Sequence, residues 1–89
     1  MKINNCFVLR KIKEENFLVP YRKNCVSRDV IYLNRVGNEI FRQAPGCLNM
    51  AVLLDNVAET FGVQDDAEAR TQIKEFIEQA MSIGLLEDE

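Results

Sequence analysis

The pattern of apolar and polar positions changes character about a third of the way along the chain. Two short apolar runs, residues 6–12 and 17–20, lie on either side of the polar segment 13–16, and the predicted strands span residues 6–12 and 16–20. Apolar runs around a polar turn predict a β-hairpin, with Asn16 in the left-handed conformation that asparagine tolerates. A β-branched and aromatic run at 29–33 predicts a third strand. We therefore expect a small antiparallel sheet.

Beyond this sheet, apolar residues recur with the 3.6-residue period of a helix. The predicted helices span residues 35–44, 49–61 and 66–83. Asn34 is the expected N-cap of the first helix, and Pro45 with Gly46 ends it. Gly62 and Gly84 are the stop signals of the second and third helices.

Strands followed by helices are typical of an α+β fold. We predict one domain, residues 1–89, in which a three-stranded antiparallel sheet precedes three helices. Four apolar positions of the third helix are expected to face the core: Ala69, Ile73, Phe76 and Ala80. Leu85 and Leu86 are then expected to fold back onto this core.

Two features of this fold are candidates for binding. A free sheet edge is a template for an added extended chain, and the strand containing Val30, Ile31, Tyr32 and Leu33 has no proline or charge among these residues to prevent docking. The second feature is a stripe beside the core-facing side of the third helix, made of Arg70, Lys74, Ile77 and Met81. It would form the wall of a groove for a peptide with acidic residues, so Lys74→Glu or Ile77→Asp is expected to weaken peptide binding with the fold intact.

Each feature also has a purely structural interpretation. The third strand can equally be central in the sheet or covered. Arg70 and Lys74 can equally pair with acidic neighbours on an exposed helix face, namely Glu75, Glu78 and Asp66, where each pair contributes about 0.3 to 0.5 kcal/mol.

Composition argues against several kinds of site. The chain of 89 residues has no histidine, which removes Ser-His and Cys-His nucleophile arrangements and the commonest general base. Cys6, Cys25 and Cys47 are widely separated, a pattern typical of reduced thiols rather than of a disulfide framework or a zinc site. We expect no enzymatic activity, no cofactor and no metal.

The same composition bears on location and charge. No apolar run approaches the roughly 20 residues that span a bilayer, and the first residues lack a secretory signal, so we expect a cytoplasmic protein without membrane attachment. Residues 1–45 hold nine Lys and Arg against four Asp and Glu, whereas residues 46–89 hold two against ten. The two halves therefore carry opposite charge, which allows them to attract each other within one fold.

Three segments resemble one known family. Residues 32–41 read Tyr-Leu-Asn-Arg-Val-Gly-Asn-Glu-Ile-Phe, residues 53–63 read Leu-Leu-Asp-Asn-Val-Ala-Glu-Thr-Phe-Gly-Val, and residues 83–86 read Ile-Gly-Leu-Leu. Their order and spacing resemble the coenzyme PQQ synthesis protein D family, and the resemblance covers nearly the whole chain from Phe7 onward. The absence of tryptophan and the Ala-Pro-Gly-Cys connection at 44–47 depart from the proteins that make the coenzyme itself. An element from a lasso-peptide or another modified-peptide pathway agrees equally well with these residues.

The resemblance implies a winged-helix-like, non-catalytic element that recognises ribosomally made precursor peptides. In that family the leader of the precursor adds as a strand to the third strand and lies in a groove against the third helix. The bound peptide is delivered to a separate enzyme, such as a radical enzyme, a cyclase or a protease. Carried onto this sequence, the binding residues are the strand 30–33 and the stripe of Arg70, Lys74, Ile77 and Met81.

Other classes of function stay open at this point. A winged-helix DNA-binding regulator is the main alternative, although the second and third helices lie in the acidic half and DNA binding requires Lys and Arg against phosphates. A thiol enzyme would use Cys25, whose pKa the cations Arg22, Lys23 and Arg28 would lower. The free sheet edge also allows a homodimer.

Overall fold

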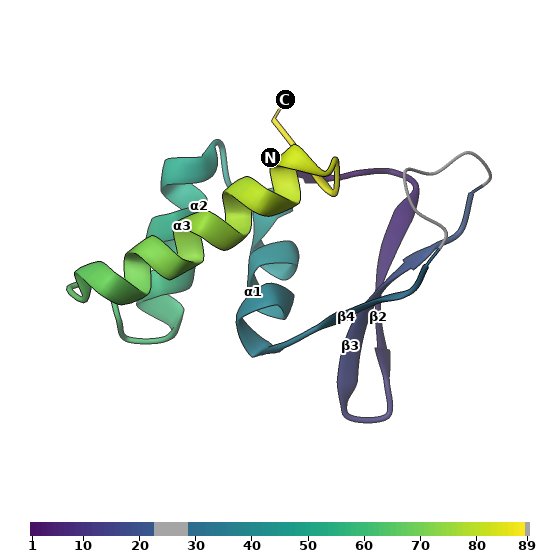
Figure 1. Ribbon diagram of the computed structural model, residues 1–89, viewed down its shortest axis with the longest axis horizontal. Coiled ribbons are helices and arrows are strands. Elements are labelled where there is room, and N and C mark those ends of the chain that lie inside the picture. Colours follow the sequence, from purple (N-terminus) through teal and green to yellow (C-terminus); the bar gives the residue numbers. More distant parts are fainter. Residues whose placement is uncertain (23–28, 89) are drawn as a thin grey trace.

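The computed structural model describes residues 1–22 and 29–88. It confirms the α+β prediction, because a three-stranded antiparallel sheet precedes three helices. The sheet contains β2 (Phe7–Ile12), β3 (Glu15–Pro20) and β4 (Ile31–Leu33), with β3 in the centre. The helices are α1 (Arg35–Gln43), α2 (Met50–Thr60) and α3 (Ala67–Ser82). All three helices lie to one side of the sheet (Figure 1).

Each helix begins at a polar residue that caps it. The side chains of Asn34, Asn49 and Asp66 accept hydrogen bonds from the backbone N–H groups of Gly37, Val52 and Ala69. Such caps satisfy N–H groups that have no partner within the helix, and each contributes about 1 kcal/mol. Because a cap and its partner lie three residues apart, the sequence predicted these starts well.

The helix ends also follow local signals. Gly62 and Gly84 have φ of +68° and +82°, in the left-handed region that favours glycine. After α1, the chain makes a short 3₁₀ turn, η1 (Ala44–Gly46), because Pro45 has no N–H with which to extend the α-helix.

The hairpin turn differs from the prediction. Ile12 pairs with Glu15, so the turn consists of Lys13 and Glu14. Lys13 has φ of 51°, whereas Asn16 lies within β3, paired with Lys11 and Leu33. The assignment of the left-handed residue to Asn16 is therefore wrong. A two-residue hairpin loop requires a positive φ within the loop, so the register determines which residue adopts it.

The core lies between the sheet and the helices. Strands β2, β3 and β4, all three helices and the segment after α3 contribute buried side chains to it. Its larger buried side chains are Met1, Phe7, Leu18, Leu33, Ile40, Phe41, Leu53, Val57, Ile73, Ile77, Leu85 and Leu86. The burial of Leu85 and Leu86 confirms that the segment after α3 folds back onto the core.

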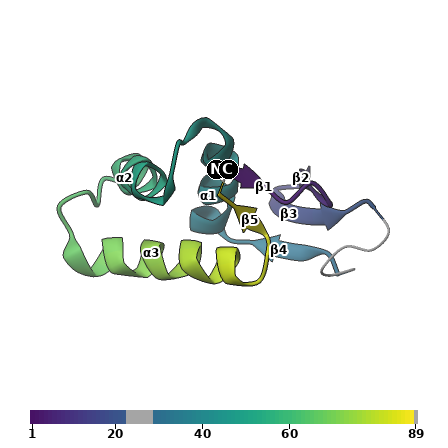
Figure 2. The same cartoon turned by 90° about the horizontal axis from the view of Figure 1, so that it is seen from above.

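A second, two-stranded sheet joins β1 (Lys2–Ile3) to β5 (Leu86–Glu87) in antiparallel register. The two segments lie side by side in both views (Figures 1 and 2). Sequence analysis did not predict this sheet, because two residues are too few to show a strand period. None of the described helices has the length and apolar content that crossing a membrane requires.

Candidate functional site: the groove between β4 and α3

Among the described residues, the third strand has a hydrogen-bonded neighbour on one side only. Its residues Ile31, Tyr32 and Leu33 pair with β3. Within residues 1–22 and 29–88, no strand pairs with its other side, so β4 is an edge strand of the described sheet. The interpretation of this strand as central is therefore wrong.

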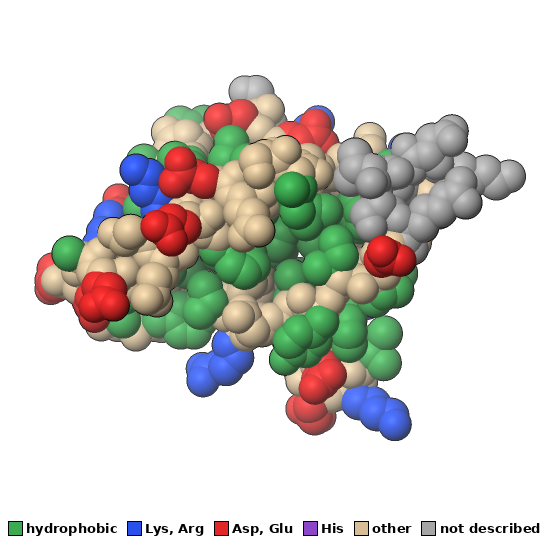
Figure 3. Space-filling model, in the orientation of Figure 1, with side chains coloured by type: hydrophobic (Ala, Val, Ile, Leu, Met, Phe, Trp, Pro, Cys, Tyr) green, Lys and Arg blue, Asp and Glu red, His purple; other side chains and the backbone are tan. Residues whose placement is uncertain are grey.

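An apolar groove of about 140 Å³ lies along this strand. Its lining residues are Ile31, Tyr32, Leu33, Phe41, Phe76, Gln79, Ala80, Ile83 and Leu85. Apart from the amide of Gln79 and the hydroxyl of Tyr32, these side chains are apolar. Figure 3 shows apolar side chains gathered around a hollow between α3 and the sheet. The groove thus combines an edge strand with an apolar helix face.

The side chains of β4 alternate between two environments, as successive strand residues do. Leu33 is buried and Ile31 is half-buried, whereas Tyr32 is 58% exposed. The ring of Tyr32 packs edge-on against Phe17 on the neighbouring strand, with 5.7 Å between centroids. The predicted site residue Val30 lies before β4 and is exposed, because pairing with β3 begins at Ile31.

The structure contradicts the predicted stripe on α3. Ile77 is 0% exposed and packs in the core with Ile73 and Ala80, so it does not form a groove wall. Phe76, which was predicted to face the core, lines the groove instead. Both predicted sets of positions recur at three and four residues, but the buried face takes Ile73 and Ala80 from one set and Ile77 from the other. The contacts of α3 with α1, α2 and β5 determine this face. Met81 is half-buried against the core and is not a lining residue.

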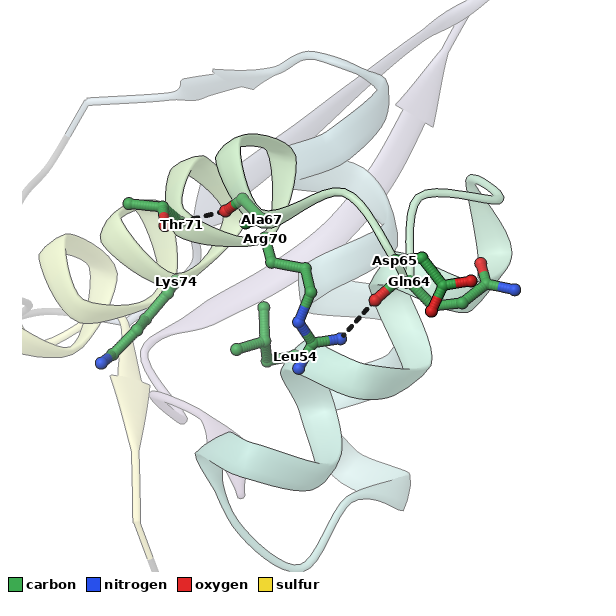
Figure 4. A pocket seen from close by; sticks show the side chains of 7 residues that line it. All are labelled: Leu54, Gln64, Asp65, Ala67, Arg70, Thr71 and Lys74. Carbon is green, nitrogen blue, oxygen red and sulfur yellow. Dashed lines mark hydrogen bonds between the residues drawn. The ribbon is translucent and has the colours of Figure 1, made fainter.

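Arg70 and Lys74 line a different pocket, of about 350 Å³, beside Leu54 of α2 (Figure 4). Arg70 donates to Asp55 Oδ1 at 2.6 Å and to the carbonyl oxygen of Gln64 at 3.5 Å. Its salt-bridge partner is thus Asp55 rather than the acidic neighbours predicted on α3. Lys74 forms no salt bridge within the described part of the chain. The predicted cations therefore do not flank the β4 groove.

Residues that the sequence did not reveal complete the groove. Gln79 was not predicted as a site residue, because an exposed amide on a helix has no distinctive pattern. Ile83 was quoted within the 83–86 segment but was not among the predicted binding residues. Gly37 allows the close approach of α1 to α3, since a Cβ there would lie 3.0 Å from Phe76 Cζ. Gly37 thus leaves room for the aromatic ring that forms one wall.

The clearest electrostatic perturbation lies on α1, away from the groove lining. Arg42 Nη2 donates to Glu39 Oε2 at 2.6 Å, and Gln43 Nε2 donates to the same oxygen at 2.8 Å. The hydrogen bond from Arg42 lowers the pKa of Glu39 below its usual value, although partial burial opposes this effect. The same bond raises the pKa of Arg42. This pair stabilises the surface of α1 and is not part of the groove.

Other candidate chemistry is limited to a few side chains. No three Cys, Asp or Glu side chains come together as metal ligands in the described residues. Cys47 is buried, and Asn56 Nδ2 donates to its sulfur at 3.4 Å. Cys25, Lys23 and Arg28, which the thiol-enzyme hypothesis requires, lie outside the described residues.

Comparisons with known proteins identify no relative: no family model, no curated protein and no solved structure matches this chain. The resemblance to the coenzyme PQQ synthesis protein D family therefore stays a prediction that rests on the three segments quoted above.

Proposed function

We propose that this chain binds an extended peptide, which adds as a strand to the free edge of β4 and lies in the groove against α3. The observation that carries this proposal is the position of the groove, whose apolar lining adjoins the unpaired edge of β4. Main-chain groups of β4 bind the peptide backbone, and the groove accepts alternate side chains.

Most of the affinity must come from the groove. β4 has three residues, so an added strand makes about two to four main-chain hydrogen bonds, each contributing about 1 kcal/mol. Micromolar binding requires about 8 kcal/mol. Each aliphatic side chain that the peptide buries contributes about 1.5 to 3 kcal/mol. These contributions must also offset the loss of translational and rotational freedom on association, at least about 4 kcal/mol, so roughly three or more such side chains are required.

The leader of a ribosomally made precursor is the proposed ligand, and the chain presents it to a separate modifying enzyme in the cytoplasm. The resemblance noted above supports this role because two of its three segments contribute residues to the groove. Residues 32–41 contribute Tyr32, Leu33 and Phe41 to the lining, and residues 83–86 contribute Ile83 and Leu85. The proposed product is a modified peptide of the coenzyme PQQ, lasso or a related pathway.

The test is an NMR titration of isotope-labelled protein with the leader of the precursor encoded nearest its gene. We expect shifts at Ile31, Tyr32 and Leu33 and along the groove side of α3, saturating at micromolar peptide. A parallel titration with duplex DNA examines the winged-helix alternative. Binding of duplex DNA without leader binding would contradict the proposal, and so would leader-induced shifts confined to the Arg70 pocket.

A matched pair of variants locates the binding surface. Ile83 is 55% exposed at the groove, and Leu48 is 83% exposed on the loop before α2. Ile83→Asp is expected to weaken leader binding at least tenfold, because it places a charge where an apolar side chain is buried on binding. Leu48→Asp makes a comparable surface change outside the groove and should leave the affinity unchanged. Equal effects of the two variants would show that the groove is not the binding surface.

A further inference from the structure

The outer face of the sheet carries more apolar side chains than a solvent-facing antiparallel sheet ordinarily does. Cross-strand partners share a face, and so do alternate residues of one strand. Tyr32 therefore shares its face with Phe17 and with Arg10, the partner of Phe17 on β2. We define the outer patch as Val8, Arg10, Ile12, Glu15, Phe17, Val19 and Tyr32.

This patch is not covered by the helices. Leu18 and Leu33 point to the opposite face and are buried, which places the helices on that side of the sheet (Figure 1). On the outer patch, Ile12 is 52% exposed, Tyr32 is 58% exposed, and Phe17 is half-buried against Tyr32. A second surface laid on this patch would therefore bury Ile12 and Tyr32, which are its exposed apolar side chains.

The two charged residues of the patch are arranged for self-association. In the strand register, Arg10 lies opposite Phe17 and Ile12 lies opposite Glu15, so these four residues form the corners of a quadrilateral. Its diagonal from Ile12 to Phe17 separates the two charged residues. Neither Arg10 nor Glu15 forms a salt bridge with any residue in 1–22 or 29–88. A two-fold axis along that diagonal brings Arg10 of each copy opposite Glu15 of the other. Such an isologous contact uses the same patch on both copies.

We propose that a second copy of this chain covers the outer patch, forming a face-to-face dimer with two symmetric Arg10–Glu15 pairs. Strand dimensions give the patch an area of about 200 to 300 Å² per copy. This is well below the roughly 800 Å² per partner of stable complexes, so the dimer is weak and forms at submillimolar to millimolar concentrations. The contact uses the face of the sheet rather than the edge of β4. Tyr32 belongs to both surfaces, because it lies on the outer patch and also lines the groove. The other patch residues are not groove-lining residues, so this proposal does not depend on the proposed peptide binding.

Sedimentation velocity between about 10 µM and 1 mM tests the dimer, with low and high salt compared because exposed charge pairs are screened. The average mass is expected to rise with concentration at low salt. Each single substitution, Arg10→Glu or Glu15→Arg, replaces both symmetric attractive pairs of the dimer by pairs of like charge. Either variant should weaken the dimer about tenfold. The double variant R10E/E15R restores opposite charges and should restore dimerisation.

Lys11→Glu is the matched control, because it makes the same charge change as Arg10→Glu on the next residue of β2, which points to the other face. It should leave the dimer unchanged, and circular dichroism checks that every variant is folded. A monomer at all concentrations would overturn the proposal, as would a double variant no better than the single ones. A dimer that Ile83→Asp abolishes would place the contact in the groove beside β4 and would also overturn it.

Discussion

Lys13 adopts a backbone conformation that a lysine side chain disfavours. Its φ of 51° lies in the left-handed region, where the Cβ approaches the carbonyl oxygen at a cost of roughly 1 kcal/mol. The conformation persists because the pairing of Ile12 with Glu15 leaves only two residues for the turn. The strain at this position is therefore imposed by the strand register, not by the local preference of lysine.

Glycine at this position should stabilise the fold. Lys13→Gly removes the side-chain strain of roughly 1 kcal/mol and adds about 0.5 kcal/mol of backbone entropy cost, so the free energy of unfolding rises by about 0.5 kcal/mol. Glu14→Gly changes the neighbouring turn residue, which has no positive φ, and should lower the free energy of unfolding by a similar amount. Urea unfolding of both variants measures the difference, and a loss of stability in Lys13→Gly would contradict this account.

At the scale of the element, α3 has three distinct surfaces around its circumference. Ile73, Ile77 and Ala80 face the core, Phe76 and Gln79 line the groove with the following Ile83, and Arg70 and Lys74 lie beside α2. The sequence predicted the helix, with Asp65 or Asp66 as its cap, but assigned Ile77 and Phe76 to the wrong surfaces. A helix with apolar residues over so much of its circumference offers several equivalent stripes, and only its packing partners select one.

Two substitutions on α3 separate the core from the surface. Ile77→Ala leaves a cavity at a fully buried position and should lower the free energy of unfolding by about 3 kcal/mol. Lys74→Ala, one turn away on the exposed surface, should change it by less than about 0.5 kcal/mol. Thermal or urea unfolding measures both. The sequence predicted that Ile77→Asp would leave the fold intact. Because Ile77 is fully buried, we now expect this variant to lose the fold, since its charge would be buried without a partner.

At the scale of the whole molecule, the first and last described segments hold the end of α3 in place. Asn4 donates from its backbone N–H to the carbonyl oxygen of Leu85 at 2.9 Å and from its side chain to that of Gly84 at 2.8 Å. Its Oδ1 also accepts a hydrogen bond from the N–H of Cys6 at 2.9 Å. Because Leu85 lines the groove, these bonds connect the start of the chain to the shape of the candidate site.

Removal of this connection should destabilise the molecule measurably. Asn4→Ala loses both side-chain hydrogen bonds, so the free energy of unfolding should fall by about 1 to 2 kcal/mol. Asn4→Asp keeps an oxygen for the N–H of Cys6 but places a carboxylate oxygen against the carbonyl oxygen of Gly84 in place of the donor. Its free energy of unfolding should therefore also fall below that of the parent protein. Urea unfolding, with hydrogen exchange at the amide of residue 4, provides the measurement. Equal stability of all three proteins would show that this contact is not needed.

The sequence by itself determined the features that depend on neighbours a few residues apart. The α+β order, the starts of the helices at Asn34, Asn49 and Asp66, and the stops at Gly62 and Gly84 arise from hydrogen bonds and backbone preferences within one turn. Tertiary structure alone decided the pairing of β1 with β5, the burial of Ile77 and the meeting of β4 with Phe76 and Ile83. These contacts join segments far apart in the chain, and their energies depend on packing geometry that no local pattern encodes.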